Sequence, residues 1–184
     1  MIEDGWRDKV LSFWFSELTE KDWFSGSEEV DDKIRNRFSE LHSELAKGTP
    51  PETRTDPNAA LAAVIVLDQF SRNMFRKQPA AFSADTVALD IARHAVEAGL
   101  DTQLPEDRRW FLYMPFMHSE VLSDQERCVD LFKQNGGEES INYAIEHRDI
   151  IARFGRFPHR NRALGRESTP EEIAFLEGHE GYGQ

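Results

Sequence analysis

Apolar residues recur at helical spacing along almost the whole chain. The first stripe has the spacing i, i+3, i+4 and i+7 and consists of Leu11, Trp14, Phe15 and Leu18. A longer stripe runs from Val30 to Leu45 and stops before Gly48, which predicts one long amphipathic helix. The segment from Pro50 to Pro57 holds prolines, threonines and charges, so we expect an exposed linker there.

The middle of the chain continues this helical pattern. Residues 58–75 are apolar almost all round in their first half, which favours a helix buried in the centre of a bundle. Ser83 is expected to cap a further helix that stops at Gly99. Pro115 lies inside a very apolar stretch, and a proline there should end or kink the helix near Met114.

Two capping patterns and one further stripe mark the C-terminal helices. Ser123 with Glu126 resembles a capping box, and so does Thr169 with Glu172, where a proline occupies the first helical position. Residues 139–154 form another amphipathic stretch. No segment alternates convincingly with a period of two. We therefore predict an all-α fold of seven to nine helices, joined by short connections into antiparallel hairpins.

Length and charge narrow the class of protein. The chain has 184 residues, 39% of them hydrophobic, which suits a single helical domain over residues 1–184 and rules out disorder throughout. It carries 34 acidic and 22 basic side chains, a net charge of −12. Such a chain is a poor binder of nucleic acid or anionic membranes, because that binding depends on basic residues. No nucleic-acid or membrane partner is therefore expected.

Cysteine content and hydropathy indicate where the protein works. Cys128 is the single cysteine, so no internal disulfide can form and nothing indicates an oxidising compartment. The longest apolar run, from Ala59 to Leu67, is less than half of the roughly 20 residues that a membrane-spanning helix needs. The N-terminus lacks the pattern of a secretory signal. We expect a cytoplasmic protein.

Polar residues interrupt the apolar stripe of residues 67–76. Asp68 and Arg72 continue the inward face of the helix and lie four residues apart, so they can pair. One interpretation is a buried structural ion pair, since buried charges need partners. The other is a carboxylate and a guanidinium that line a pocket, with Asn73 beside them.

His118 and Glu120 follow directly after the proline-containing stretch. Their spacing matches no known zinc motif, so we predict no metal site. A hydrogen-bonded histidine at a helix junction is the simpler interpretation of His118.

Positive charge is concentrated in residues 147–166. This segment holds six arginines and one acid, which gives it a charge of +5 and leaves −17 on the rest of the chain. A turn shaped by Gly155 and Pro158 presents several of these side chains. The arginines can pair with acids elsewhere, or they can bind a carboxylate or phosphate bidentately.

These polar segments together resemble the bacterial proteins of domain of unknown function family 924. The likeness extends from about Lys9 to Leu176 and rests on residues 10–15, 67–73, 118–120, 148–161 and 164–172. The resemblance implies a tetratricopeptide-like stack of helical hairpins and no established activity. Ser71 stands where the family more often has proline, at a position that we expect to face solvent.

The sequence favours a protein that binds a small anionic ligand or a peptide terminus in an arginine-lined pocket, without a cofactor. The arginines proposed to hold the anion are Arg72, Arg153, Arg156 and Arg160. The proposed hydrogen-bonding residues are Asn73, His118, His159 and Asn161. One alternative is a hydrolase in which Asp68, His118 or Glu120 acts as general acid or base. Another is a scaffold whose helical groove binds a partner protein.

Overall fold

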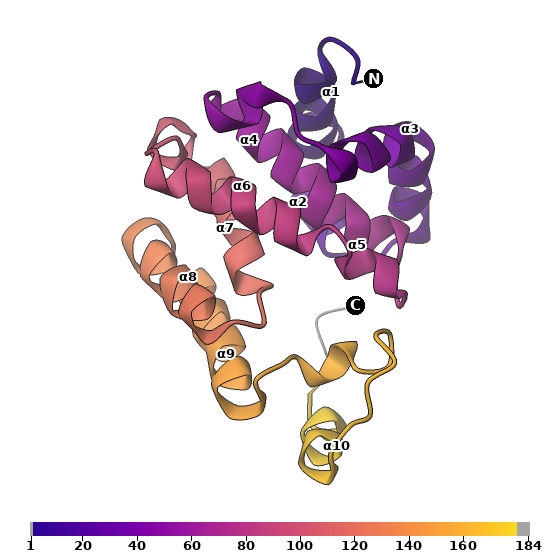
Figure 1. Ribbon diagram of the computed structural model, residues 1–184, viewed down its shortest axis with the longest axis vertical. Helices are drawn as coiled ribbons and strands as arrows, with labels where there is room; N and C mark the ends of the chain where they lie inside the picture. The colour runs from indigo at the N-terminus through magenta and orange to yellow at the C-terminus, as the bar shows by residue number, and fades with distance from the viewer. Residues whose placement is uncertain (1, 180–184) are drawn as a thin grey trace.

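The computed structural model describes residues 2–179, and helices dominate this part of the chain (Figure 1). The α-helices are α1 (Trp6–Ser12), α2 (Glu20–Trp23), α3 (Glu28–Lys47), α4 (Pro57–Val64), α5 (Ser71–Met74), α6 (Asp85–Glu97), α7 (Glu106–Met117), α8 (Leu122–Asn135), α9 (Glu138–Phe154) and α10 (Pro170–Glu177). Two π-helical segments, Phe13–Glu17 and Ile65–Phe70, continue α1 and join α4 to α5. With these joined helices counted once, the described residues form nine helices and no strand, which confirms the all-α prediction.

A continuous central helix, from α4 through the π segment to α5, forms the middle of the fold (Figure 1). The Asp56 side chain caps its N-terminus by accepting hydrogen bonds from the amides of Asn58 and Ala59, and Pro57 occupies the first turn. Every residue from Ala59 to Leu67 is 0% exposed. The prediction of a central buried helix is therefore confirmed.

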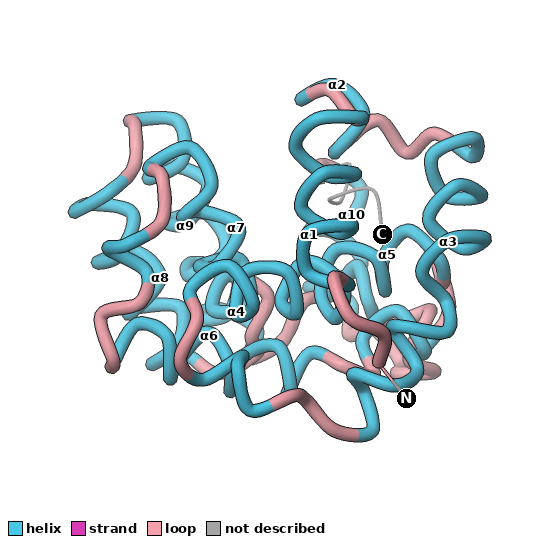
Figure 2. Tube along the Cα trace, turned by 90° about the horizontal axis from the view of Figure 1, so that it is seen from above, coloured by secondary structure: helices cyan, strands magenta, loops and turns pink. Residues whose placement is uncertain are grey.

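The other helices surround this central helix on several sides. The long helix α3 packs against the π segment and α5, while α1 and α6 pack against α4. The last helices form consecutive pairs, α6 with α7, α7 with α8 and α8 with α9. Seen from above, α7, α8 and α9 lie on one side and α1, α3 and α5 on the other (Figure 2). The stacking typical of tetratricopeptide repeats stays a prediction.

Several predicted helix ends agree with the structure. Helix α3 stops before Gly48, and α9 stops at Gly155, whose φ of 68° lies in the left-handed region that glycine adopts without strain. Thr169 and Glu172 form the expected capping box at α10. In each case the signal lies within four residues of the helix end, where backbone geometry depends on local sequence.

Other local predictions are wrong or hold only in part, because tertiary contacts override them. The Pro50–Pro57 linker contains a 3-10 helix, Pro51–Arg54, that packs against α4 and buries Thr53 completely. Ser83 does not cap α6; its hydroxyl donates to the carbonyl oxygen of Ala80 in the preceding turn.

Pro115 and the capping box expected at Ser123 also differ from expectation. The predicted helix end near Met114 is wrong, because α7 continues past Pro115 to Met117, and Phe116 and Met117 of its last turn are buried in the core. A kink at this proline stays a prediction. No capping box forms at Ser123, since α8 already begins at Leu122. Instead the Ser119 hydroxyl accepts from the amide of Val121 and donates to Asp124.

Ser71 does not face solvent. It is 0% exposed, and its hydroxyl donates to the carbonyl oxygen of Leu67 at 2.7 Å and lies 2.6 Å from Nε2 of His42. The expectation of a solvent-side position is wrong because α3 covers this face of the central helix.

The C-terminal segment, residues 155–179, forms a small unit of its own that includes the 3-10 helix Pro158–Arg160 and α10 (Figure 1). A separate apolar cluster joins this unit to α9 and consists of Ile150, Ile151, Phe154, Phe157 and Phe175. The C-terminal unit also makes polar contacts with Asp85 of α6 and with Glu120, which follows α7, and these are described below. In the described residues, none of the helices is both long enough and apolar enough to span a membrane.

Candidate functional site

Asp68 lies at the centre of a buried polar cluster. It belongs to the π-helical segment Ile65–Phe70 and is 0% exposed. Its Oδ1 lies 2.7 Å from Nδ1 of His118 and 3.0 Å from Nη1 of Arg72, and its Oδ2 accepts from Nε2 of Gln69 at 2.6 Å. Burial alone would raise the pKa of this carboxyl, but Arg72 and the hydrogen bonds lower it well below the usual range. Asp68 is therefore ionised.

The π segment explains how Asp68 and Gln69 come to lie side by side. A π turn contains more residues than an α turn, so two consecutive polar side chains can share the inward direction. Such segments are uncommon and are frequent at functional sites. Here the segment places a charged carboxylate directly after the buried apolar run from Ala59 to Leu67.

Arg72 links Asp68 to the N-terminus of α6. Its Nη1 donates to Oδ1 of Asp85 at 2.9 Å and its Nη2 donates to Oδ2 at 3.0 Å, a bidentate pair. Nη1 also donates to the carbonyl oxygen of Asp68 at 3.0 Å. The predicted pair of Asp68 and Arg72 forms, and Asp85 is an additional partner. Its position in the first turn of α6 marked it only as an ordinary N-terminal acid.

Arg160 approaches the carboxylate of Asp85 from the C-terminal segment. It is 5% exposed, and its guanidinium carbon lies 4.8 Å from the ring centroid of Phe82 and 4.5 Å from that of Phe157. The carboxylate paired with it is Asp85, whose Oδ2 is 3.8 Å from Nη1, beyond hydrogen-bonding distance. Within residues 2–179 its guanidinium donates no hydrogen bond. Burial, together with the nearby charge of Arg72, lowers the pKa of Arg160 to about 10.

His118 completes the cluster at the C-terminal end of α7. It is 7% exposed, and Nδ1 is the nitrogen that contacts Asp68. Its Nε2 forms no hydrogen bond with any described residue. Burial and the charge of Arg72 lower the pKa of His118, although Asp68 opposes this change. The imidazole is therefore neutral near pH 7.

Glu120 holds the C-terminal segment in place through hydrogen bonds and an ion pair. Its Oε1 accepts from the amide of Phe157 at 2.8 Å, and both of its oxygens accept from Arg166 at 2.7 and 2.9 Å. These contacts attach the C-terminal segment to the end of α7. The carboxylate is fully engaged, so the structure removes Glu120 from the candidate acids and bases.

Arg153 and Arg156 pair with glutamates of α10. Nε and Nη2 of Arg156 donate to Glu172 at 2.7 and 2.9 Å, and the same two atoms of Arg153 donate to Glu171 at 3.0 and 2.8 Å. For these two arginines, the structure therefore agrees with the first interpretation of the sequence, in which the arginines pair with acids elsewhere in the chain. We therefore leave them out of the candidate site.

The remaining candidates also have neighbours of their own. Asn73 donates to Asp31 on α3 at 2.7 Å. Asn161 donates to Ser168 and Glu172 at 3.1 and 3.3 Å, within the C-terminal segment. His159 is half-buried beside Phe157, and burial lowers its pKa to about 3. The structure thus brings together Asp68, Arg72, His118 and Arg160 of the predicted set, and adds Gln69, Phe82 and Asp85.

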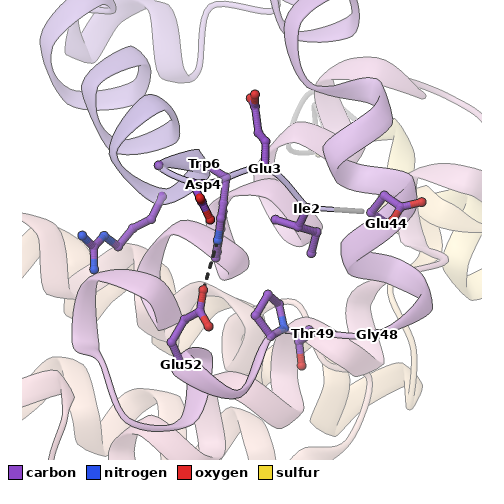
Figure 3. A pocket seen from close by; sticks show the side chains of 11 residues that line it. Ile2, Glu3, Asp4, Trp6, Glu44, Gly48, Thr49 and Glu52 are labelled. Atoms are coloured by element: carbon purple, nitrogen blue, oxygen red, sulfur yellow. Dashed lines mark hydrogen bonds between the residues drawn. The ribbon is translucent and has the colours of Figure 1, made fainter.

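A hollow of about 640 Å³ lies elsewhere, between the N-terminal segment and the end of α3 (Figure 3). The indole of Trp6 donates to Glu52 across it at 3.3 Å. Its ionisable lining is mainly acidic and consists of Glu3, Asp4, Arg7, Glu44 and Glu52. This charge favours cations and makes the hollow unsuited to the anion predicted from the sequence. No group of three potential metal ligands occurs in the described residues.

Comparisons with known proteins agree with the resemblance seen in the sequence. The model of a family described as "Bacterial protein of unknown function (DUF924)" matches residues 10–180. A solved structure of a protein of unknown function, ATU0120 from Agrobacterium tumefaciens, is 37% identical, with a TM-score of 0.89. The match covers 94% of this chain and 97% of that one. No curated protein matches the chain.

Proposed function

This chain belongs to the DUF924 family of bacterial proteins, whose description assigns no function, and we propose that it binds a small anion at Arg160, beside Arg72 and His118. The single observation that carries the proposal is the environment of the Arg160 guanidinium. It is charged, 5% exposed and without a hydrogen bond among the described residues. Burying a charge without hydrogen bonds is costly, and an anionic ligand would remove that cost.

The neighbouring charges leave Arg160 as the group that lacks a close partner. Asp68 is satisfied by Arg72, His118 and Gln69. Asp85 is taken up bidentately by Arg72 and lies 3.8 Å from Arg160. One guanidinium is therefore available for one negative charge, and planar guanidinium groups hold carboxylates and phosphates through two parallel hydrogen bonds.

The surroundings favour a small ligand. Of the Arg160 nitrogens, only Nε is both sealed from solvent and unbonded, so the two Nη atoms form the edge at which a ligand can arrive. The Asp85 side chain beside that edge is 22% exposed. A polyanion would meet the repulsion of a chain whose net charge is −12. A single phosphate or carboxylate group is small enough to reach the Nη atoms and carries too little charge to be strongly repelled.

Binding of inorganic phosphate tests the proposal. With a Kd of about 1 mM, roughly 10 mM phosphate would stabilise the protein by about 1.4 kcal/mol and raise the melting temperature by roughly 3–6 °C relative to sodium chloride of equal ionic strength. Arg160→Met should abolish this rise. Arg153→Met is the matched control, because Arg153 also lies within the arginine-rich residues 147–166 and pairs with Glu171. A rise that persists in Arg160→Met, or no rise in the wild type, would overturn the proposal.

A hydrolase is a second candidate, favoured by the hydrogen bond between Asp68 and Nδ1 of His118. A carboxylate that orients an imidazole leaves Nε2 to accept a proton from water. Glu120, which the sequence also offered as a general acid or base, has no catalytic role in this candidate mechanism. Release of p-nitrophenol from p-nitrophenyl phosphate by the wild type, and not by His118→Gln, would support it, whereas equal rates would refute it.

A further inference from the structure

The unbonded nitrogen of His118 is a hydrogen-bond acceptor. Asp68 is an ionised carboxylate and can only accept hydrogen bonds, so Nδ1 of His118 must carry the hydrogen that lies between them at 2.7 Å. A neutral imidazole has a hydrogen on only one of its two ring nitrogens, and in His118 that nitrogen is Nδ1. Nε2 therefore presents a lone pair to whatever occupies the site.

The neighbouring charges keep the imidazole neutral. Arg72 shares Oδ1 of Asp68 with His118, so a guanidinium lies next to the ring. Arg160 is the other cation that opposes protonation of His118, and Asp68 is the anion that favours it. A proton added to Nε2 would be a further positive charge in the field of both arginines, on a side chain that is 7% exposed.

A ligand at this site meets two different requirements. The terminal nitrogens of Arg160 are donors and need acceptor oxygens. Nε2 of His118 is an acceptor and needs a donor. An oxygen without hydrogen placed against Nε2 would bring two lone pairs together and leave both groups unsatisfied, which costs binding free energy.

We propose that the site selects oxyanions that also carry a hydroxyl hydrogen, with Arg160 donating to the charged oxygens and Nε2 of His118 accepting from the hydroxyl. Hydrogen phosphate has this chemistry near pH 7, and so does a 2-hydroxycarboxylate such as glycolate. Sulfate and acetate have the charge but no hydroxyl. The inference rests on the proposed anion site and defines which anions it takes.

Isothermal titration at pH 7.5 and constant ionic strength compares two matched pairs of anions, phosphate with sulfate and glycolate with acetate. We expect the anion with the hydroxyl to bind about tenfold more tightly or better in each pair, because a buried acceptor left unsatisfied costs about 1–3 kcal/mol. In His118→Gln the preference should fall to about twofold or less, since the amide of glutamine can turn its donor toward sulfate.

His94→Gln is the matched control. His94 lies on α6, where its Nε2 is 2.9 Å from the carbonyl oxygen of Arg54, and this variant should keep the wild-type preference. If His118→Gln does not fold, nitrogen NMR of the wild type gives the answer. Nε2 of His118 should be unprotonated without ligand, and its resonance should shift with phosphate and not with sulfate.

The outcomes separate the two proposals. If none of the four anions binds, the anion site itself is refuted, and this inference with it. If sulfate binds as tightly as phosphate, the anion site stands and the selectivity is refuted. A preference for phosphate that is unchanged in His118→Gln, or a protonated Nε2 in the free protein, would equally refute the role of His118.

Discussion

The buried charge of Arg160 should lower the stability of the protein when no ligand is present, and Arg160→Met tests this directly. Methionine is also unbranched, and although it is shorter than arginine it can pack against the same two rings, Phe82 and Phe157, which are 4.8 and 4.5 Å from the guanidinium carbon. The substitution removes the charge while filling most of the space. Asp85 keeps its bidentate partner Arg72.

The structure sets the expected magnitude. Burial and the charge of Arg72 lower the pKa of Arg160 to about 10, which corresponds to roughly 3 kcal/mol against the charged guanidinium. The two ring contacts offset this by roughly 1 kcal/mol each. Contacts of the methionine sulfur with the same rings return about 0.3–1.5 kcal/mol. Arg160→Met should therefore raise the free energy of unfolding by about 1–2.5 kcal/mol and the melting temperature by roughly 2–10 °C.

Urea denaturation in an anion-poor buffer measures the change, with melting temperature as the second readout. Arg156→Met is the informative control, because it makes the same substitution four residues earlier in the same segment. Arg156 holds Glu172 bidentately, and Glu172 is 2% exposed. Removing Arg156 leaves that buried carboxylate without its principal partner, so this variant should be less stable than the wild type.

Opposite signs for the two variants are the result that the contacts require. If Arg160→Met lowers the free energy of unfolding by about 2 kcal/mol or more, the guanidinium of Arg160 contributes to the fold and is not held ready for a ligand. The basis of the anion site would then be lost, even though Arg160 would remain buried.

Two further predictions concern the acids of the fold. Asp68→Asn should lower the free energy of unfolding by about 3 kcal/mol or more, because it removes a carboxylate that is 0% exposed and contacts Arg72 and His118; a loss below about 1 kcal/mol in urea denaturation would contradict this. Hydrogen bonds from Arg156 lower the pKa of Glu172 to about 2, so its stabilising contribution should be complete above about pH 4.5 and be lost as the pH falls toward 2. The urea midpoint of the wild type should accordingly fall more steeply than that of Glu172→Gln between these pH values, and parallel curves would refute the assignment.

Local sequence determined the helices and the contacts within them. The spacing of apolar residues identified α3 and the buried central helix, because a period near 3.6 needs information from only a few turns. The pair of Asp68 and Arg72 followed from their separation of four residues on one helix. The Thr169 capping box was equally local.

Local signals failed where packing between distant segments decided the outcome. Ser71 lies on a face that α3 covers, so a side chain expected in solvent is buried against His42. The π turn at Asp68 is equally unmarked in the sequence, since it depends on how the helix fits between its neighbours. Phe82 lies in a short 3-10 turn and Asp85 in the first turn of α6, and nothing nearby marks them as neighbours of Arg160.

The sequence by itself determined that this protein is all-α and that positive charge is concentrated in residues 147–166. Tertiary structure alone decided that Arg160, and not Arg156, is buried without a hydrogen-bonding partner. Arg156 and Arg160 are the same residue type on one loop, but α10 returns beside Arg156 and supplies Glu172. Arg160 turns the other way, toward Phe82 and Asp85. The reason is physical: pairing between segments far apart in the chain depends on how all of them pack together, and no local pattern records it.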